Sequence, residues 1–502
     1  MSQVLKLYGP PGTGKTRTLL ELFEKELVHT PADRIAFLTF TRSAKFEALG
    51  RSGKIQEELP YLRTIHSICY RQMSFAQGQM VQTRDVKEFG RSIGIKINHL
   101  PIDPWAAEEW EIPEYQPMAT QADMLLQLNH RGRHRRIGLK ESLQDVNINI
   151  DHYFAKWFTD SYRRWKDSEA MYDYTDILTT FLAVGKPLPI DVMFVDEAQD
   201  LSVLQWDVIH RLGSEAARWY LAGDDDQAIF QWAGASPERF IKERYDEQQF
   251  LDITYRLPRR VFTQAQQVIQ KVRARVKKPL RPRDEEGQVR EIHAIDTIEK
   301  KEFIDTSTFV LFRNHYRGML LAQEMEAAGI PFDGPHSILA RPEVRNVLTA
   351  WHKTTTNALW SPAEARAVSA LVGVDNLKPE AKNLKEKLIR PDAVLQKMPE
   401  GKEWPRLLAK VLKADGINYT LGIVAAHGWD ALLHPRTRLM SIHQSKGGQA
   451  DRVILDVCML RKSFESLVRD EDSEHRVWYV GITRAKEELL TLMPNDQLVY
   501  EL

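Results

Sequence analysis

The chain has 502 residues, of which 43% are hydrophobic and 27% charged, so it is long enough for several domains of an ordinary soluble kind. It has no apolar run of membrane-spanning length, no signal-peptide pattern and only two cysteines, Cys69 and Cys458, which argues against a membrane or disulfide-stabilised protein and favours the cytoplasm. Because 69 basic residues balance 69 acidic ones, a nucleic-acid binder of this composition must gather its positive charge locally.

Short apolar runs that end in polar or glycine residues have the character of buried strands. Between several of them lie helical patterns, such as the stripe of Leu19, Leu20, Phe23 and Leu27. Strands that alternate with helices predict parallel, doubly wound sheets. The strand-like runs are "VLKLYG" (4–9), "IAFLTF" (35–40), "VMFVDE" (192–197), "WYLAG" (219–223), "TFVLFR" (308–313), "RVILDV" (452–457) and "LLTLM" (489–493).

These runs fall into two groups, roughly 1–260 and 300–500, and each group is interrupted. The interruptions, residues 72–165 and 346–435, contain many helix formers and charges but few strand-like runs. We therefore predict an α/β fold with two parallel-sheet cores, each carrying a mostly helical insertion.

The stretch "GPPGTGKT" (9–16) follows a predicted strand, opens a predicted helix and fits the phosphate-loop pattern G-x-x-x-x-G-K-[ST]. Its glycines let backbone N–H groups point at phosphate oxygens, Lys15 reaches the terminal phosphates, and Thr16 offers its hydroxyl to Mg²⁺. A chance glycine-rich turn is the alternative, but the order of strand, loop and helix argues against it. The predicted nucleotide-binding residues here are Gly9, Pro10, Pro11, Gly12, Thr13, Gly14, Lys15, Thr16 and Arg17.

The stretch "MFVDEAQD" (193–200) brings Asp196 and Glu197 to the carboxyl end of a predicted strand, where ligands of such sheets bind. Asp196 can hold Mg²⁺ through water, and Glu197 can act as general base on the attacking water. Alone, the pair could be a solvated acidic loop. Together with the phosphate loop, it predicts a nucleoside triphosphatase.

The stretch "LAGDDDQAIFQWAGA" (221–235) sets three aspartates, an amide and two aromatic rings together at a strand end. An aromatic face such as that of Trp232 is a sequence-tolerant platform for an unstacked base, although a tryptophan in a protein core is the commoner case. Two basic runs, "HRGRHRR" (130–136) and "KVRARVKKPLRPR" (271–283), are either solvated loops or phosphate contacts.

The ordered set of motifs resembles the UvrD/Rep/PcrA type of superfamily 1 DNA helicases, in a compact form of the phage or plasmid kind. The resemblance spans residues 9–489, and the combination of "VDEAQD", "GDDDQ" and "VGITRA" is highly specific. The matching stretches are "GPPGTGKT", "TFTRSAK" (39–45), "RTIHSICY" (63–70), "YDYTDIL" (172–178), "FVDEAQDLS" (194–202), "AGDDDQAIFQWAGA", "TYR" (254–256), "SIHQSKGGQADRVIL" (441–455) and "YVGITRAKEEL" (479–489).

The resemblance implies two RecA-like domains with ATP between them and translocation on single-stranded DNA in the 3′ to 5′ direction. It implies that Gln227 senses the γ-phosphate, that Arg256 and Arg484 are arginines contributed across the cleft, and that Tyr255 stacks on adenine. The implied DNA contacts are Phe40, Thr41, Thr64, His66, Trp232 and His443. For His66 and His443, a buried, hydrogen-bonded structural histidine is the alternative.

The domains implied are residues 1–71 with 166–252 (first RecA-like), 72–165 (helical insertion), 253–345 with 436–502 (second RecA-like) and 346–435 (a reduced insertion). The sequence also departs from the family pattern. No adenine-reading glutamine motif is visible before Gly9, Ala233 follows Trp232 where arginine is usual, and Gln449, an expected nucleotide contact, takes a usual glutamate position.

We therefore expect an ATP- and Mg²⁺-dependent helicase acting on single-stranded and forked DNA in replication, repair or recombination, as a monomer without a membrane partner. A translocase that strips bound proteins but opens duplex weakly is the alternative. A DNA-binding adaptor with a vestigial ATPase is a third possibility, which the intact set of catalytic residues argues against.

Overall fold

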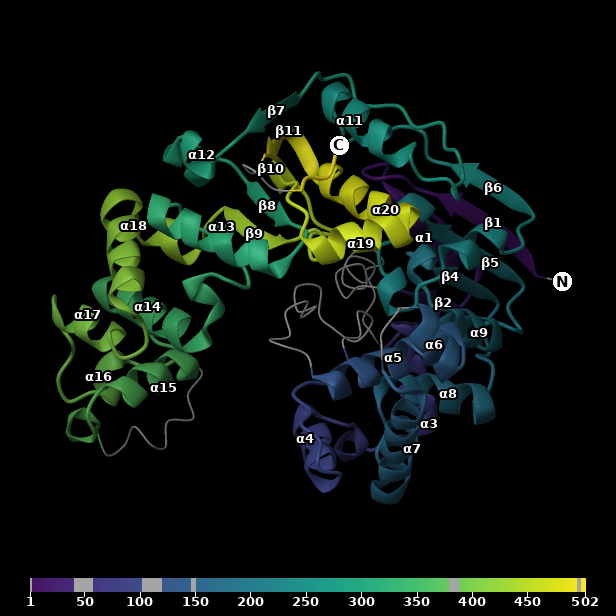
Figure 1. Ribbon diagram of the computed structural model, residues 1–502, viewed down its shortest axis with the longest axis horizontal. Coiled ribbons are helices and arrows are strands. Elements are labelled where there is room, and N and C mark those ends of the chain that lie inside the picture. The colour runs from purple at the N-terminus through teal and green to yellow at the C-terminus, as the bar shows by residue number, and fades with distance from the viewer. Residues whose placement is uncertain (1, 40–56, 102–119, 146–149, 379–387, 494–497) are drawn as a thin grey trace. The chain divides into compact units, whose positions relative to one another are not determined.

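The structure is a computed structural model that describes residues 2–39, 57–101, 120–145, 150–378, 388–493 and 498–502. The chain forms two compact units, shown as a ribbon in Figure 1. The first comprises Met1–Glu286 and Ser466–Thr483, and the second comprises Gly287–Glu465 and Arg484–Leu502. In the part of the chain that the structure describes, no helix combines the length and the apolar character needed to cross a membrane.

The first unit is built on a six-stranded sheet in which every neighbouring pair is parallel. Its order is β3 (Leu62–Arg63), β2 (Ile35–Leu38), β4 (Val192–Val195), β5 (Arg218–Gly223), β1 (Gln3–Tyr8) and β6 (Glu247–Phe250). All four residues of β2 and of β4 are buried, as expected of central strands covered on both faces. Since the strands are parallel, β1, β4 and β5 end at the same edge of the sheet.

Helices cover this sheet and form its insertion. The insertion, built mainly on α4, α5, α6 and α7, has an apolar cluster of its own around Phe89, Leu125 and Phe158. The helices of the unit are α1 (Lys15–His29), α3 (Ile65–Met73), α4 (Thr83–Ser92), α5 (Gln121–Arg135), α6 (Leu139–Asp145), α7 (His152–Glu169), α8 (Tyr174–Val184), α9 (Val203–Leu212), α10 (Pro237–Lys242), α11 (Arg259–Ile269) and α20 (Glu471–Ile482), with short 3-10 turns η1 (Ala32–Arg34), η2 (Gln77–Gln79), η3 (Ala198–Asp200), η4 (Asp225–Gln227) and η5 (Gln231–Ala233).

The second unit has a five-stranded, wholly parallel sheet in the order β7 (Gln288–Ile292), β11 (Ala485–Leu492), β10 (Ala450–Asp456), β8 (Thr308–Phe312) and β9 (Thr437–Ser441). Its helices are α12 (Lys300–Asp305), α13 (His315–Ala328), α14 (Pro342–Thr355), α15 (Pro362–Leu371), α16 (Pro391–Val394), α17 (Glu403–Leu408) and α18 (Ala414–Leu433), with turns η6 (Ile295–Thr297), η7 (Ile338–Ala340) and η8 (Val374–Asn376). Helix α19 (Arg461–Arg469) begins in this unit and ends in the first. Helices α14 to α18 enclose a separate core in which the rings of Trp351 and Trp404 stack 5.8 Å apart.

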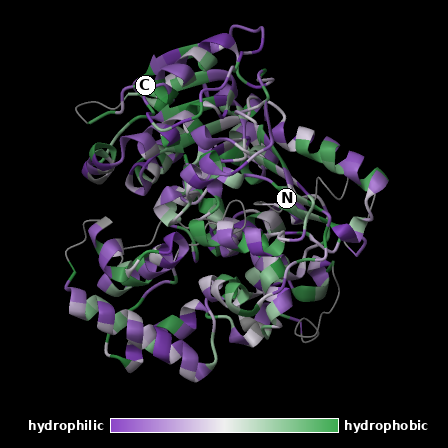
Figure 2. Cartoon of the chain, turned by 90° about the vertical axis from the view of Figure 1, so that its right-hand side faces the viewer, coloured by the Kyte–Doolittle hydropathy of each residue, from purple (hydrophilic) through white to green (hydrophobic). Residues whose placement is uncertain are grey.

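The predicted fold class is confirmed: both sheets are parallel and flanked by helices, and both interruptions are helical where the structure describes them. In Figure 2 the helices show hydrophilic and hydrophobic colour in alternation along their length. The first compact unit continues to residue 286, past the predicted boundary at 252, because Thr254 bonds to the loop after β1, Lys278 pairs with the aspartates at 224–226, and α20 packs against η4. The division into four domains and insertions stays a prediction.

Candidate functional site

The loop between β1 and α1 has the backbone that a phosphate loop requires. Gly12 and Gly14 have φ of 73° and 79°, in the left-handed region where glycine is favoured. A Cβ atom on Gly9 would lie 2.3 Å from the Cβ of Lys15, so a larger residue does not fit there. The hydroxyl of Thr13 donates to the carbonyl of Pro10 at 2.8 Å and holds the turn closed.

Lys15, the first residue of α1, is buried between two carboxylates. Its Nζ forms an ion pair with Glu197 and lies 3.5 Å from Oδ1 of Asp196. Burial alone would lower the pKa of Lys15, but the charges of Glu197 and Asp196 raise that pKa above its ordinary value. The ammonium group is therefore charged at neutral pH and has anionic partners at the place where the phosphate loop would receive a phosphate.

The two carboxylates follow β4, whose neighbours in the sheet are β2 and β5. Asp196 accepts the backbone N–H of Glu197 at 2.9 Å through Oδ1. Glu197 has a φ of 53°, an uncommon left-handed conformation for a residue with a side chain. This turn directs the Glu197 side chain to Lys15, and 25% of that side chain remains exposed.

Thr16 and Asp196 are the pair that fits a hard cation. The Thr16 hydroxyl lies 3.4 Å from Oδ2 of Asp196, and both are oxygen donors of the kind that Mg²⁺ prefers. Within the described residues, no group of three or more His, Cys, Asp or Glu could hold a metal ion. Since Mg²⁺ takes six oxygen ligands, oxygens of a bound nucleotide and water would complete the shell that these two side chains begin.

Gln227 lies in η4, just after β5, and its side-chain amide donates to Oδ2 of Asp224 at 2.8 Å. The aspartates at 224–226 are all buried, with exposures of 2% or less. The Nζ of Lys278 lies 3.0, 2.7 and 2.8 Å from carboxylate oxygens of Asp224, Asp225 and Asp226. Burial lowers the pKa of Lys278 but the three carboxylates raise it more, so the net shift is upward and the lysine is charged.

The segment 254–256 lies on the phosphate loop within the first unit. The Thr254 hydroxyl donates to the carbonyl of Pro11 at 2.7 Å, and the N–H of Tyr255 donates to the carbonyl of Gly12 at 2.9 Å. The Tyr255 side chain is 73% exposed, so its ring is open to a ligand. Arg256 donates to the carbonyl of Thr483 at 3.1 Å, and burial lowers the pKa of Arg256 to about 10, which leaves it charged at neutral pH.

Three predicted residues belong to the second unit. Arg484, directly before β11, is 1% exposed and donates to the carbonyl of Gly448 at 3.2 Å. His443, in the turn after β9, is 5% exposed, and Gln449, just before β10, is exposed. The nucleotide roles of Arg484 and Gln449 stay predictions.

The predicted DNA contacts of the first unit differ in exposure. Trp232, in η5, is half-buried. Thr64 caps α3, where its hydroxyl accepts the N–H of Ser67 at 3.3 Å. His66 is 6% exposed and lies edge-on to the ring of Tyr174. The burial of His66 and His443 favours the alternative given above for both, a buried structural histidine. Phe40 and Thr41 lie outside the described residues.

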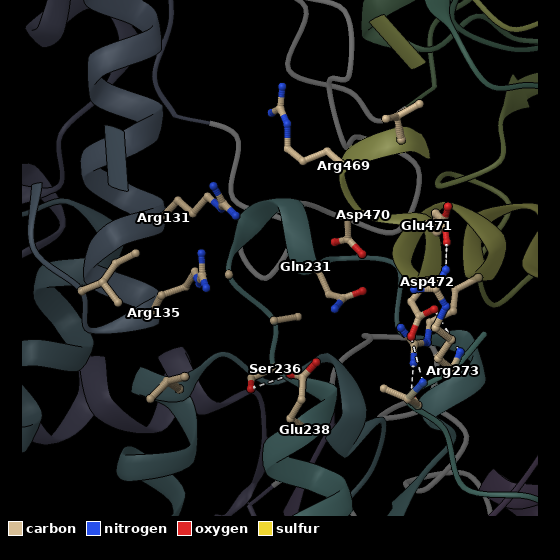
Figure 3. A pocket seen from close by; sticks show the side chains of 17 residues that line it. Arg131, Arg135, Gln231, Ser236, Glu238, Arg273, Arg469, Asp470, Glu471 and Asp472 are labelled. Atoms are coloured by element: carbon tan, nitrogen blue, oxygen red, sulfur yellow. Dashed lines mark hydrogen bonds and ion pairs between the residues drawn. The ribbon is translucent and has the colours of Figure 1, made fainter. Parts of the chain in front are cut away.

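A cavity of about 630 Å³ in the first unit adjoins the turn that carries Trp232. Figure 3 shows Arg131 and Arg135 projecting into it from α5, with Gln231 from η5 and Arg469 nearby. Four acids also line it. Glu471 pairs with Arg273, and the Asp472 carboxylate accepts the N–H groups of Arg273 and Ala274 at 3.0 and 2.8 Å. Asp470 accepts the N–H of Ser473 at 3.1 Å, and Glu238 accepts the hydroxyl of Ser236 at 3.2 Å. Five arginines line the cavity (Arg131, Arg135, Arg273, Arg469 and Arg476), so cations outnumber the acids of its wall by one.

The two basic runs are neither purely solvated nor purely available to phosphate. In the first run, Arg133 pairs with Asp173 and Asp176, whereas Arg131 and Arg135 line the cavity. In the second run, Lys278 enters the aspartate cluster and Arg275 holds Asp226 through two contacts of 2.8 and 2.5 Å. Some cations of both runs therefore have a third role: they form ion pairs with acids that lie far away along the chain.

The sequence did not indicate Lys278 or Gln199 as parts of the site. The amide of Gln199 donates to Oε2 of Glu197 at 2.6 Å and accepts the N–H of Asp224 at 2.9 Å. The one feature of the sequence that could have indicated Gln199 is its place directly after "DEA". For Lys278, the signal is the run of three buried acids, which needs a buried cation from elsewhere.

Comparisons with known proteins find DNA helicases. Residues 1–248 match the profile of the UvrD/REP helicase N-terminal domain, and residues 403–495 match that of the UvrD-like helicase C-terminal domain. The ATP-dependent DNA helicase Rep of Buchnera aphidicola subsp. Acyrthosiphon pisum is 22% identical over 609 aligned positions, covering 95% of this chain and 90% of that protein. PcrA, an ATP-dependent DNA helicase of Staphylococcus aureus, is 22% identical, covering 67% of this chain, which spans half of PcrA's length.

A solved structure, the Arterivirus nonstructural protein 10 helicase, aligns over 98% of this chain and 60% of that one. The alignment has 11% identity and a TM-score of 0.34, which is too low a likeness to support a structural conclusion.

Proposed function

The chain belongs to the UvrD/Rep/PcrA family of superfamily 1 DNA helicases, and from that premise we propose that it hydrolyses ATP to move along single-stranded DNA, 3′ to 5′, and to separate duplex DNA. The observation that carries the proposal is the arrangement around Lys15. A charged, buried lysine, two carboxylates and a threonine hydroxyl meet at the edge of the sheet where the phosphate loop ends.

The geometry supports a division of labour in hydrolysis. The phosphates of ATP displace the carboxylates from Lys15, so that Glu197 can orient and deprotonate the attacking water. Thr16 and Asp196 would hold Mg²⁺, which neutralises phosphate charge when bound. Gln227 would contact the γ-phosphate, and Arg256 and Arg484 would stabilise the charge that develops on it.

We propose that the DNA strand lies along Trp232 and the arginine-lined cavity. A base would stack on the tryptophan while its phosphates meet Arg131 and Arg135, because aromatic faces and cations together bind single strands without reading sequence. Support comes from η5 and the residue after it, which carry Trp232 and contribute Gln231 and Gly234 to the cavity. Both cysteines are buried and neither forms a disulfide, in keeping with the reducing, cytoplasmic setting that we propose.

The test is ATP hydrolysis with and without a single-stranded oligonucleotide, for the wild type and Lys15→Ala. We expect DNA to stimulate the wild type and the variant to be inactive. Duplexes with a 3′ or a 5′ tail, with and without ATP, then measure strand separation. Separation of the 3′-tailed duplex supports the helicase; displacement of a bound protein without strand separation favours the translocase; hydrolysis that is absent or insensitive to DNA contradicts both.

A further inference from the structure

We propose that Gln199 is a positioning residue, which holds the general base Glu197 in its working orientation and joins it to the γ-phosphate contact Gln227. The inference rests on the proposed function, because it takes the roles of Glu197 and Gln227 from there. It adds a residue that contacts neither nucleotide nor DNA, and it assigns a physical connection between the base and the residue that senses the phosphate.

The amide of Gln199 is completely buried, and both of its ends are bonded. Its Nε2 donates to Oε2 of Glu197 at 2.6 Å and to Oδ2 of Asp200 at 2.9 Å. Lys15 contacts the other carboxylate oxygen of Glu197, Oε1. When ATP takes Lys15 away, the contact from Gln199 is still in place to fix the direction of the carboxylate.

The other end of the amide reaches the next strand of the sheet. Oε1 of Gln199 accepts the N–H of Asp224 at 2.9 Å, and the Asp224 carboxylate accepts the side-chain N–H of Gln227 at 2.8 Å. Lys278 holds the second carboxylate oxygen of Asp224 at 3.0 Å. Three hydrogen bonds thus join Glu197 to Gln227 through Gln199 and Asp224, and we expect a shift of Gln227 to reach the amide along them.

Gly223, the last residue of β5, shows how closely the amide is fitted. A Cβ atom on Gly223 would lie 2.8 Å from Oε1 of Gln199 and 2.8 Å from Cζ of Phe240. Glycine at this position therefore leaves room for the amide. Gly223→Ala perturbs the same bond from the other side, without changing Gln199 itself.

The decisive variant is Gln199→Leu, which keeps the volume of the side chain and removes its hydrogen bonds. We expect kcat for ATP hydrolysis to fall by about tenfold or more, the usual effect of removing a partner that orients a catalytic group. KM for ATP should change by less than about threefold, because the missing interaction orients the base rather than binding the nucleotide. The acidic limb of the kcat–pH profile should move to higher pH, since a carboxylate without a donated N–H is protonated more readily.

The matched control is Gln205→Leu. Gln205 is also buried and accepts a backbone N–H, that of Ser202, at 2.8 Å, but it makes no bond to Glu197. This control should keep the wild-type pH profile even if it lowers stability. Gly223→Ala should lower kcat and move the acidic limb as Gln199→Leu does, and it decides the question if Gln199→Leu does not fold.

The outcomes separate the two levels of inference. If Glu197→Gln hydrolyses ATP like the wild type, the proposed function is wrong and this inference falls with it. A second outcome overturns only the positioning role. In it, Glu197→Gln is inactive, but Gln199→Leu keeps the kcat and pH profile of the wild type or of Gln205→Leu. Gly223→Ala replaces Gln199→Leu in this comparison if the latter does not fold.

Discussion

Gly12 lies directly against Arg256: a Cβ atom on the glycine would be 2.3 Å from the Cβ of the arginine and 2.7 Å from Oγ1 of Thr254. The phosphate loop is thus fixed from outside by a segment about 240 residues later in the chain. That contact makes the glycine necessary for a second reason besides its left-handed backbone.

We expect Gly12→Ala to weaken ATP binding by about tenfold or more, because a left-handed alanine costs about 1–2 kcal/mol and its Cβ also pushes Arg256 away. Nucleotide titration followed by fluorescence or calorimetry measures this. Gly78→Ala is the control, since nothing lies within 4 Å of a Cβ atom there. Equal affinities in the two variants would contradict the role given to this contact.

Lys278 is the centre of the aspartate cluster, and Lys278→Met leaves three buried carboxylates without their shared cation. We expect a loss of about 3–5 kcal/mol in the free energy of unfolding of the first unit, as for other broken buried ion pairs. Denaturant titration measures it. Arg281→Met, in the same basic run, removes an exposed pair with Asp252 and should cost less than about 1 kcal/mol. Similar losses for both would show that the cluster is not held by Lys278.

For Trp232→Ala, we expect weaker stimulation of ATP hydrolysis by single-stranded DNA and a largely unchanged rate without DNA. Base–aromatic stacking contributes about 1–3 kcal/mol, so the DNA concentration at half-stimulation should rise about fivefold or more. Trp157→Ala, a tryptophan of α7 that is 43% exposed, serves as the control. Identical DNA stimulation in the wild type and Trp232→Ala would refute stacking at this position.

Replacing both Arg131 and Arg135 by alanine should weaken DNA binding and make it less sensitive to salt. The slope of log affinity against log salt concentration should become shallower by about 1 for each DNA phosphate that is no longer neutralised. Arg136→Ala, the control, removes an arginine that pairs with Asp207 outside the cavity. An unchanged salt slope in the double variant would place the DNA phosphates elsewhere.

His134 predicts an acid sensitivity of the first unit. Its ring is completely buried, with Nδ1 2.8 Å from Oγ of Ser202; burial, and then the charge of His130, lower its pKa well below 6.5. The native state therefore cannot take up the proton that the unfolded chain binds below about pH 6.5, so stability falls as pH drops, by up to about 1.4 kcal/mol per pH unit. Unfolding measured at pH 7 and pH 5 should show a smaller loss for His134→Gln, and equal losses would contradict this assignment.

The sequence alone identified the seven interior strands, because a strand covered on both faces must be apolar along its whole length. The four strands that it missed, β3, β6, β7 and β9, are the outermost strands of the two sheets. Two of them, Glu247–Phe250 and Gln288–Ile292, carry exposed and polar side chains that resemble a loop. In these two strands exposure leaves the composition unconstrained, so the local pattern does not distinguish them from a loop.

The same division holds for the site. Lys15, Thr16, Asp196 and Glu197 follow from the sequence, since short motifs carry both their chemistry and their backbone geometry. That Lys278 contacts three aspartates more than 50 residues away, and that the amide of Gln199 joins the segments after two strands, was decided by the tertiary structure. Such partners meet only when parallel strands bring their carboxyl ends to one edge, and nothing in the local sequence records which residues will meet there.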